Sequence, residues 1–162
     1  MTLSQIDILE LLKEVKDPEI PVLNVVDMGI VRKVESIDDK TVVTITPTYS
    51  GCPAMDVISA NIKTTLRRHL GDEVEVVSTL SPAWTTAWLT DDAKEKLREY
   101  GIAPPVEDTN DKSVLFGEPK VIKCPKCGAQ DTRMVSEFGS TSCKAHYQCN
   151  VCQEPFDYFK CI

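Results

Sequence analysis

Apolar residues near the start of the chain recur at the spacing of a helix. Ile8, Leu12 and Val15 follow one another by four and three positions, which places them on one face of an α-helix. Ser4 precedes this stripe, and its hydroxyl can accept a hydrogen bond from a free N–H of the first turn. Pro18 disfavours the helical conformation in the residue before it, so the pattern predicts a helix that ends at that point.

The next apolar residues alternate with polar ones, which is the period of a half-buried strand. We expect strands over residues 30–36 and 41–46. In the second of these, Val43 and Ile45 alternate with threonines. Residues 38–40 have the composition of a turn, so the two strands should form a hairpin.

Helical spacing returns after the loop that contains Cys52. The apolar stripe of this second helix consists of Met55, Ile58, Ile62 and Leu66. Gly71 is a natural stop for the helix, and a valine-rich segment from residue 74 predicts a third strand. A strand–helix–strand unit of this length normally forms a right-handed parallel crossover. We therefore expect an α-β-β-α-β module, with one layer of helix on one layer of sheet.

A third helix is expected from Thr90 to Gly101, because a good N-cap residue and a terminating glycine flank it. Residues 102–119 contain three prolines and scattered acids without a clear period, so we interpret them as a linker. The predicted fold class is α+β. It comprises a small two-layer domain over residues 1–101, the linker, and a β-ribbon over residues 120–162.

Two tryptophans, Trp84 and Trp88, lie four residues apart before the third helix. At that spacing they can form one aromatic face. We expect both to pack in the core, with binding of a partner protein as the alternative.

Charge is distributed unevenly along the chain. Residues 1–118 carry 12 lysines and arginines against 21 acids, a net charge of −9, whereas residues 119–162 carry a net charge of +2. An acidic body repels phosphate backbones, so nucleic acid is not an expected partner. No apolar run approaches the roughly 20 residues that span a bilayer, and the first residues lack the features of a signal peptide. We therefore expect no membrane partner, and a cytoplasmic protein whose thiols are kept reduced.

The strongest chemical signal is a pair of Cys-x-x-Cys motifs in the C-terminal segment. The four cysteines are Cys124, Cys127, Cys149 and Cys152. Two residues between cysteines allow a tight turn to direct both sulfurs at one ion, and two such turns give the tetrahedral geometry of structural zinc. The 21 residues between the motifs fit two antiparallel strands, over residues 132–137 and 142–148. We therefore predict that these cysteines bind a zinc ion, which supplies much of the folding free energy of so short a segment.

Three further potential ligands lie in the same segment: Cys143, His146 and Cys161. The spacing of Cys143, His146 and Cys149 is also typical of a metal site, although strand alternation favours different faces for the first two. One interpretation is that the extra cysteines are packing residues. The sharper hypothesis is a second, more labile site for iron or a cluster, built from Cys143 and Cys161.

A lone cysteine lies at the start of the second helix. Cys52 follows Gly51, which permits a tight entry into the helix, and the free N–H groups and the helix dipole favour an anion there. We therefore expect the thiolate of Cys52 to form more easily than that of free cysteine. Asp17, Glu19 and Asp27 lie in earlier loops that can converge on it. The alternative is a small apolar residue that fills the cap.

Three motifs in the first hundred residues carry a family resemblance. They are residues 17–21 (Asp-Pro-Glu-Ile-Pro), 26–31 (Val-Asp-Met-Gly-Ile-Val) and 46–53 (Thr-Pro-Thr-Tyr-Ser-Gly-Cys-Pro). This part of the chain resembles the MIP18 family, also called DUF59. The resemblance implies an α/β fold and a role in iron–sulfur or metal-centre assembly. The residues that match the signature of the family, and that it implies as a transfer site, are Asp17, Glu19, Asp27 and Cys52.

The C-terminal segment carries a narrower resemblance, in residues 136–145 and 154–161. Together with the first module it covers nearly the whole chain and resembles the D-subunit family of the phenylacetyl-coenzyme A epoxidase system. This resemblance implies a place in aerobic phenylacetate catabolism beside a di-iron monooxygenase. The implied partners are other subunits of a multicomponent oxygenase, or an iron–sulfur client protein. The implied cofactors are structural zinc and a transient iron ion or iron–sulfur cluster.

The leading hypothesis is a non-enzymatic assembly or maintenance factor that uses Cys52 as its transfer ligand, with a homodimer as one way to complete the ligand set. One alternative is a structural adaptor of the oxygenase complex that transfers no metal. Another is a thiol redox enzyme. A Cys–His hydrolase is not expected, because His69 lies near the far end of the second helix, about 25 Å from Cys52 at 1.5 Å per residue.

Overall fold

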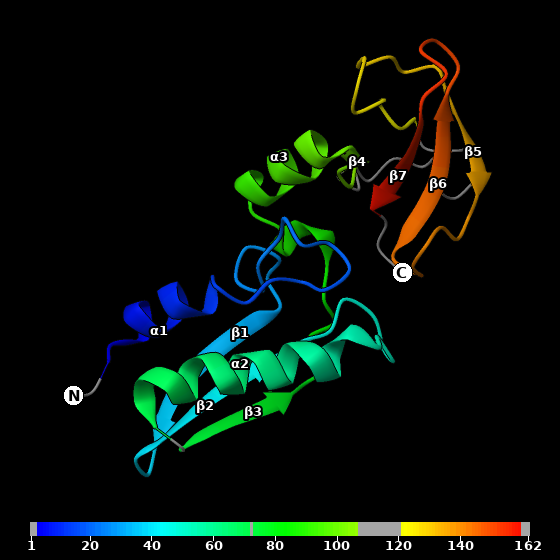
Figure 1. The fold of residues 1–162 in the computed structure, drawn as a ribbon. Coiled ribbons are helices and arrows are strands. Elements are labelled where there is room, and N and C mark those ends of the chain that lie inside the picture. The colour runs from blue at the N-terminus through cyan, green and yellow to red at the C-terminus, as the bar shows by residue number, and fades with distance from the viewer. Residues whose placement is uncertain (1–2, 72, 107–120, 160–162) are drawn as a thin grey trace. The chain divides into compact units, whose positions relative to one another are not determined.

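The computed structural model describes residues 3–71, 73–106 and 121–159. The chain divides into two compact units, Met1–Ala93 and Lys94–Ile162. The first holds a three-stranded sheet and the second a four-stranded sheet (Figure 1). Within the described residues, no helix has both the length and the apolar character that crossing a bilayer requires.

Helix α1 (Gln5–Leu12) begins with the cap that the sequence predicts. The hydroxyl of Ser4 accepts a hydrogen bond from the backbone N–H of Asp7 at 3.2 Å. The carboxylate of Asp7 accepts one from the N–H of Ser4 at 3.0 Å, which completes a capping box. The helix ends at Leu12, and Val15 is buried in the turn that follows.

The predicted order α-β-β-α-β is confirmed in the first unit (Figure 1). Strands β1 (Val31–Ile37) and β2 (Lys40–Ile45) form the expected antiparallel hairpin, and β3 (Val74–Ser78) pairs with β2 in parallel. Asp38 and Asp39 in the hairpin turn have φ angles of 50° and 62°. Two consecutive positive φ angles match the right-handed twist of the strands, which explains why short polar residues occupy this turn.

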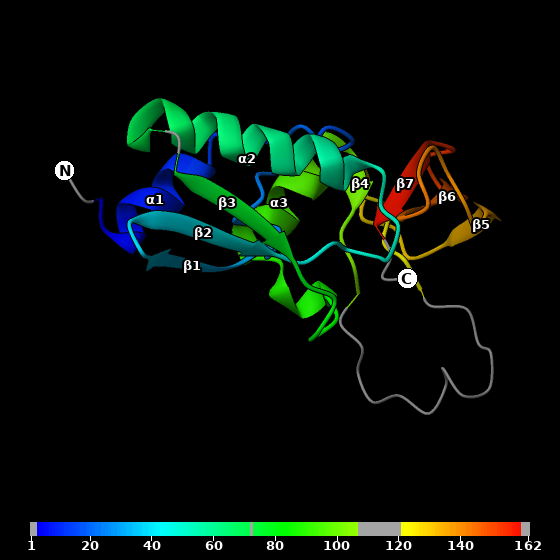
Figure 2. The same ribbon diagram turned by 90° about the horizontal axis from the view of Figure 1, so that it is seen from below.

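Helix α2 (Ala54–Leu70) connects β2 to β3 and lies across one face of the sheet (Figure 2). Its residues Ile58, Ile62 and Leu66 are fully buried, as predicted, whereas Met55 is half-buried. Each buried side chain of this size contributes about 1.5–3 kcal/mol to stability. Because α2 runs back along the sheet, its N-terminus lies at the carboxyl ends of the two parallel strands. This arrangement places Cys52 at that end of the module.

The second unit contains the predicted ribbon. Strands β5 (Thr132–Ser136), β6 (Lys144–Cys149) and β7 (Pro155–Phe159) form an antiparallel sheet. The bounds of β5 and β6 fall within two residues of the predicted ones. The chain enters this unit through helix α3 (Asp91–Tyr100), which Thr90 caps as expected, since its hydroxyl accepts a hydrogen bond from the N–H of Ala93 at 3.1 Å.

Residues 102 and 103, expected in the linker, instead form strand β4 (Ile102–Ala103), which pairs in parallel with β7. Ala103 is 1% exposed and belongs to the apolar core of the ribbon. The hydroxyl of Tyr158 also accepts a hydrogen bond from the N–H of Val106 at 3.3 Å. A strand of two residues has no periodic pattern, so only the pairing reveals it. The expected linker residues 107–119 lie outside the described part of the chain, and the predicted domain limits stay a prediction.

Candidate functional site

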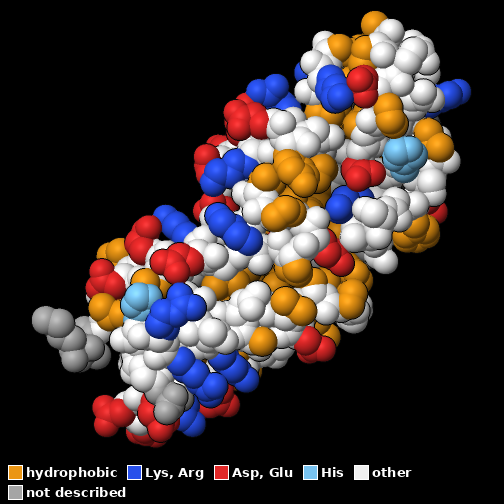
Figure 3. Space-filling model, viewed as in Figure 1, with side chains coloured by type: hydrophobic (Ala, Val, Ile, Leu, Met, Phe, Trp, Pro, Cys, Tyr) orange, Lys and Arg blue, Asp and Glu red, His pale blue; other side chains and the backbone are white. Residues whose placement is uncertain are grey.

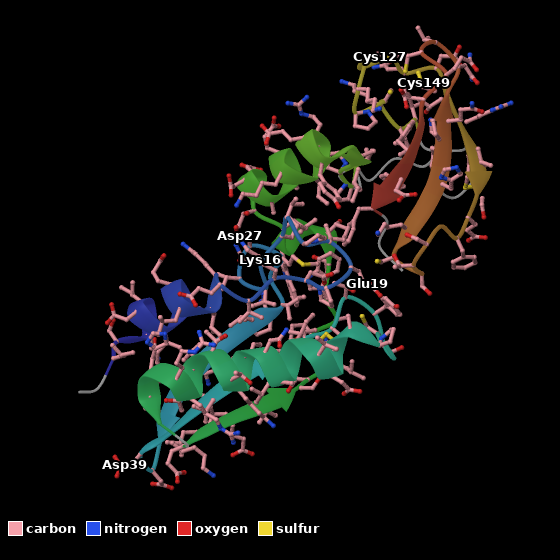
Figure 4. The ribbon with its side chains drawn as sticks, in the orientation of Figure 1. Lys16, Glu19, Asp27, Asp39, Cys127 and Cys149 are labelled. Atoms are coloured by element: carbon pink, nitrogen blue, oxygen red, sulfur yellow. The ribbon has the colours of Figure 1, made fainter. Side chains whose placement is uncertain are left out.

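Four cysteine sulfurs meet at one end of the ribbon, where Figure 4 labels Cys127 and Cys149. The sulfurs of Cys124 and Cys152 are 3.7 Å apart, and those of Cys127 and Cys149 are 3.6 Å apart. All four lie within 4.8 Å of one another. A tetrahedral zinc ion with bonds of about 2.3 Å requires sulfurs about 3.8 Å apart. The cysteines predicted from the spacing therefore fit a zinc ion.

The backbone of both turns supports this arrangement. The residue after each motif, Gly128 or Gln153, has a positive φ of 74° or 64°, so the two turns close in the same way. The N–H groups of Val151 and Cys152 approach the sulfur of Cys149 at 3.4 and 3.5 Å. These N–H groups stabilise negative charge on the sulfur and orient it toward an ion.

The four thiols cannot all ionise easily without a cation. The hydrogen bond from the backbone N–H of Cys152 lowers the pKa of Cys149 to about 7. The backbone N–H of Glu154 lowers the pKa of Cys152, but desolvation and the neighbouring cysteines outweigh it and raise this pKa to about 12. A dication at the centre reverses this repulsion, because it favours every thiolate at once.

The remaining potential ligands of the ribbon do not join this cluster. Cys143 is buried, and its sulfur lies 3.1 Å from the hydroxyl oxygen of Thr141. His146 lies 3.5 Å from Asp157 on the neighbouring strand, and Cys161 is outside the described residues. Among the residues that the structure describes, three or more potential metal ligands come together only in the four-cysteine cluster. The site expected from Cys143 and Cys161 stays a prediction.

We expected Cys52 immediately before the second helix, but α2 begins at Ala54 and Pro53 lies between them. Pro53 is the N-cap of α2, and the carbonyl of Cys52 accepts a hydrogen bond from the N–H of Met55 at 3.2 Å. Gly51 has a φ of 80°, which allows the tight entry predicted for this residue. The first turn of α2 therefore begins directly beside the thiol.

The expectation that Cys52 ionises easily is wrong for the protein without a cation. Partial burial raises the pKa of Cys52 above its usual value, and the negative charges of Glu19 and Asp17 raise it further. Hydrogen bonds from the N–H of Ala54 and from Tyr49 oppose this shift but do not overcome it. Sequence reasoning included the helix terminus but not the burial or the sign of the nearby charges.

Asp17 and Glu19 are thus brought into the neighbourhood of Cys52, and Asp17 also shapes the turn that carries them. Its carboxylate, 6% exposed as a residue, accepts hydrogen bonds from the N–H groups of Glu19 and Ile20 at 2.7 and 2.8 Å. These bonds fix the backbone of Glu19, which follows α1 in the loop labelled in Figure 4.

Asp27, the fourth expected residue, is held in a different set of contacts. Its carboxylate accepts a hydrogen bond from the side-chain amide of Asn24 at 2.8 Å. The amide oxygen of Asn24 in turn accepts hydrogen bonds from the N–H groups of Val26 and Asp27 at 3.0 and 2.8 Å.

One residue between β2 and Cys52 has no counterpart in the sequence-based prediction. Thr46 directly follows β2, is 1% exposed, and carries a buried hydroxyl oxygen without a hydrogen-bond partner. Most buried hydroxyls are paired, so this one is an exception within the loop that leads to Cys52. The sequence alone does not show that the hydroxyl of a threonine after a strand will be buried without a hydrogen-bond partner.

Two protein-family models match the chain. The family described as iron-sulfur cluster assembly protein matches residues 5–79, and the PaaD zinc beta ribbon domain matches residues 108–160. These matches agree with the expected order of an assembly-type module followed by a zinc ribbon.

Curated relatives agree with these two family matches. The putative D subunit of 1,2-phenylacetyl-CoA epoxidase from Escherichia coli (strain K12) is 47% identical over 156 residues, which cover 96% of this chain and 92% of the relative. An Fe-S protein maturation auxiliary factor from Porphyromonas gingivalis is 34% identical over 93 residues, which cover 56% of this chain and 88% of the relative.

Two solved structures resemble the fold. One is a domain of unknown function DUF59 from Bacillus anthracis, with a TM-score of 0.54 and 28% identity over 57% of this chain and 90% of that one. The other is a conserved hypothetical protein from Thermotoga maritima, with a TM-score of 0.51 and 29% identity over 60% of this chain and 98% of that one. The predicted fold class is thereby confirmed.

Proposed function

The chain belongs to the D-subunit family of 1,2-phenylacetyl-CoA epoxidase, and from this premise we propose that it is an accessory protein that assembles or maintains a metal centre of a multicomponent oxygenase. The homology to Fe-S maturation factors supports the assembly role. The substrate of the proposed reaction is an iron ion or iron–sulfur cluster, which passes from this chain to a client protein. The proposed compartment is the cytoplasm, because free thiols persist there.

The observation that carries this proposal is the composition of the Cys52 site. A thiol and two carboxylates lie close enough for their charges to interact, and these charges oppose a free thiolate. The same charges attract a cation, because a bound metal ion replaces the thiol proton and is stabilised by the carboxylates of Asp17 and Glu19. Because Cys52, Asp17 and Glu19 do not form a closed ligand cluster among the described residues, the site favours a transient ion over a permanent one.

A nucleophilic enzyme is disfavoured by the position of the bases. The chain has two histidines. His69 lies at the opposite end of the 17-residue helix α2 from Cys52, and His146 is engaged by Asp157 in the ribbon. Catalysis by a cysteine needs an adjacent base or a lowered pKa, and burial and the carboxylates raise the pKa of Cys52 instead. We therefore propose a carrier rather than a catalyst.

The decisive experiment measures the transfer itself. A Cys52→Ser variant should lose at least about tenfold in the rate at which it restores iron content and activity to an apo client of the epoxidase system, because serine is a poor ligand for iron. Ser50→Ala, two residues away and exposed, is the matched control and should transfer at the wild-type rate. If Cys52→Ser supports full reconstitution with normal ribbon zinc, the transfer role is excluded.

A structural adaptor is the second candidate, and the surface of the ribbon favours it. Met134 and Val135 on β5 are each 56% exposed, and Phe138 in the following turn is 59% exposed. Apolar side chains are visible on the outside of the ribbon at the upper right of Figure 3. Exposed apolar residues on an edge strand are typical of a docking surface for another protein. An adaptor would contain zinc alone, take up no iron and co-purify with the other subunits whether or not Cys52 is present.

A further inference from the structure

The segment of residues 84–90, here called the strap, lies outside the part of the chain that matches the assembly-protein family. Trp84 is 5% exposed, as expected for a core residue, and its indole N–H donates a hydrogen bond to the carbonyl of Met28 at 2.8 Å. Trp88 forms the end of a short 3-10 helix (Thr86–Trp88), and the guanidinium of Arg32 lies 3.5 Å from the centroid of its ring. Trp88 is only half-buried, so the expectation of a core residue is confirmed for Trp84 but not for Trp88.

The strap approaches residues 24–30, here called the hub, so closely at Gly29 that no side chain fits there. A Cβ atom on Gly29 would lie 2.6 Å from the Cβ of Trp88 and 2.8 Å from its carbonyl oxygen. Gly29 also has a φ of 71°, which other residues rarely adopt. The N–H of Thr90 donates to the carbonyl of Asp27 at 3.1 Å. Three consecutive residues of the hub are thus in contact with the strap.

The hub is also the common anchor of both arms of the Cys52 site. On one side, the carbonyl of Leu23, directly before the hub, accepts a hydrogen bond from the N–H of Asp17 at 2.9 Å, and Lys16 forms a β-bridge with Asn24. On the other side, the carbonyl of Ile30 accepts a hydrogen bond from the N–H of Thr46 at 2.8 Å. The first contact holds the turn with the carboxylates, and the second holds the start of the loop that leads to Cys52.

We propose that the strap sets the relative position of the thiol and the carboxylates, with Trp84 and Gly29 as positioning residues that do not themselves touch the ion. The biological role of this positioning rests on the proposed function of the Cys52 site. The claim that the strap holds the thiol and the carboxylates in place does not depend on that function. If the hydrogen bond from the indole is lost, the hub gains freedom and both arms move with it. The ligand geometry then loosens while the remainder of the unit stays folded.

The first test is the rate at which iodoacetamide alkylates Cys52 in the full-length, zinc-loaded protein, read from the peptide mass well below the melting temperature. Trp84→Phe keeps the aromatic packing but removes the N–H, and it should raise this rate about tenfold, the scale of one lost buried hydrogen bond. Trp88→Phe is the matched control and should stay within about twofold of the wild-type rate. Gly29→Ala should match Trp84→Phe by displacing the strap from the other side.

The second test reads the site with cobalt(II), after the ribbon has been filled with zinc. The affinity that depends on Cys52 should be about tenfold weaker in Trp84→Phe than in Trp88→Phe, with equal zinc content and with melting temperatures that differ by no more than about 10 °C, because the same lost hydrogen bond also lowers the stability of the unit. Wild-type alkylation rates in both Trp84→Phe and Gly29→Ala would overturn the proposal that the strap positions the thiol and the carboxylates. A wild-type protein that binds no cobalt through Cys52 would overturn the proposed function instead, while the alkylation rates would still decide the role of the strap.

Discussion

Cys52 illustrates that the chemistry of one residue depends on groups that are distant in the sequence. A helix N-terminus favours a thiolate, but partial burial and the carboxylates of Glu19 and Asp17 act in the opposite direction and prevail. The result is a thiol whose pKa is raised above its usual value, so that it stays protonated near neutral pH. This property suits a carrier, because an idle thiolate is open to oxidation.

The contribution of Glu19 can be measured by itself. Glu19→Gln removes one negative charge from the neighbourhood of Cys52, so the pKa of Cys52 should fall toward its usual value. The alkylation rate of Cys52 plotted against pH should then rise at a lower pH than in the wild-type protein. Glu10→Gln, which removes an exposed carboxylate of α1 that is paired with Lys13, is the matched control and should leave the profile unchanged. A profile of Glu19→Gln that coincides with the wild type would mean that Glu19 is too well solvated to act on the thiol.

At the scale of elements, helix α2 connects the stability of the first unit to its site. One face of the helix packs in the core, and its first turn lies beside Cys52. The hydrophobic stripe was readable from the sequence because a spacing of three and four is a local property. The parallel pairing of β2 with β3 followed from the length of the connection and the handedness of such crossovers.

A substitution in this stripe should cost far more than one on the outer face of the same helix. Ile62 is 0% exposed, so Ile62→Ala should lower the free energy of unfolding by about 2–5 kcal/mol through lost burial and a cavity. Val57 is 47% exposed, and Val57→Ala should change it by no more than about 1 kcal/mol. Urea denaturation followed by circular dichroism measures both. Equal losses in the two variants would contradict the packing of α2.

At the scale of the whole molecule, the two units depend on different sources of stability. The first has a layer of helix on a sheet, with buried side chains from α1, α2 and β2. The second has a small apolar core of which two members, Cys124 and Cys149, belong to the four-cysteine cluster. The four-cysteine cluster and the apolar core of the ribbon therefore share residues, and strand β4 contributes Ala103 to the same core.

Removal of the metal should unfold the second unit selectively. A chelator should abolish the protection of backbone amides in β5, β6 and β7 against hydrogen exchange, since zinc binding in such sites is worth about 10–16 kcal/mol. Amides of α2 should remain protected, and added zinc should restore the ribbon. Elemental analysis shows whether the metal has left. Ribbon amides that stay protected after the zinc is gone would contradict a metal-dependent fold.

The sequence by itself determined the features that repeat or that have fixed spacing. Periods of three to four and of two located the helices and strands, and the two Cys-x-x-Cys motifs identified the four cysteines that the fold brings together. The tertiary structure alone decided the pairing of β4 with β7, the direction in which the pKa of Cys52 is shifted, and the hydrogen bond between Asn24 and Asp27. It also decided the contacts of the strap with Met28 and Gly29. These features arise from contacts between segments far apart in the chain, and neither local periodicity nor residue spacing contains information about which distant groups meet.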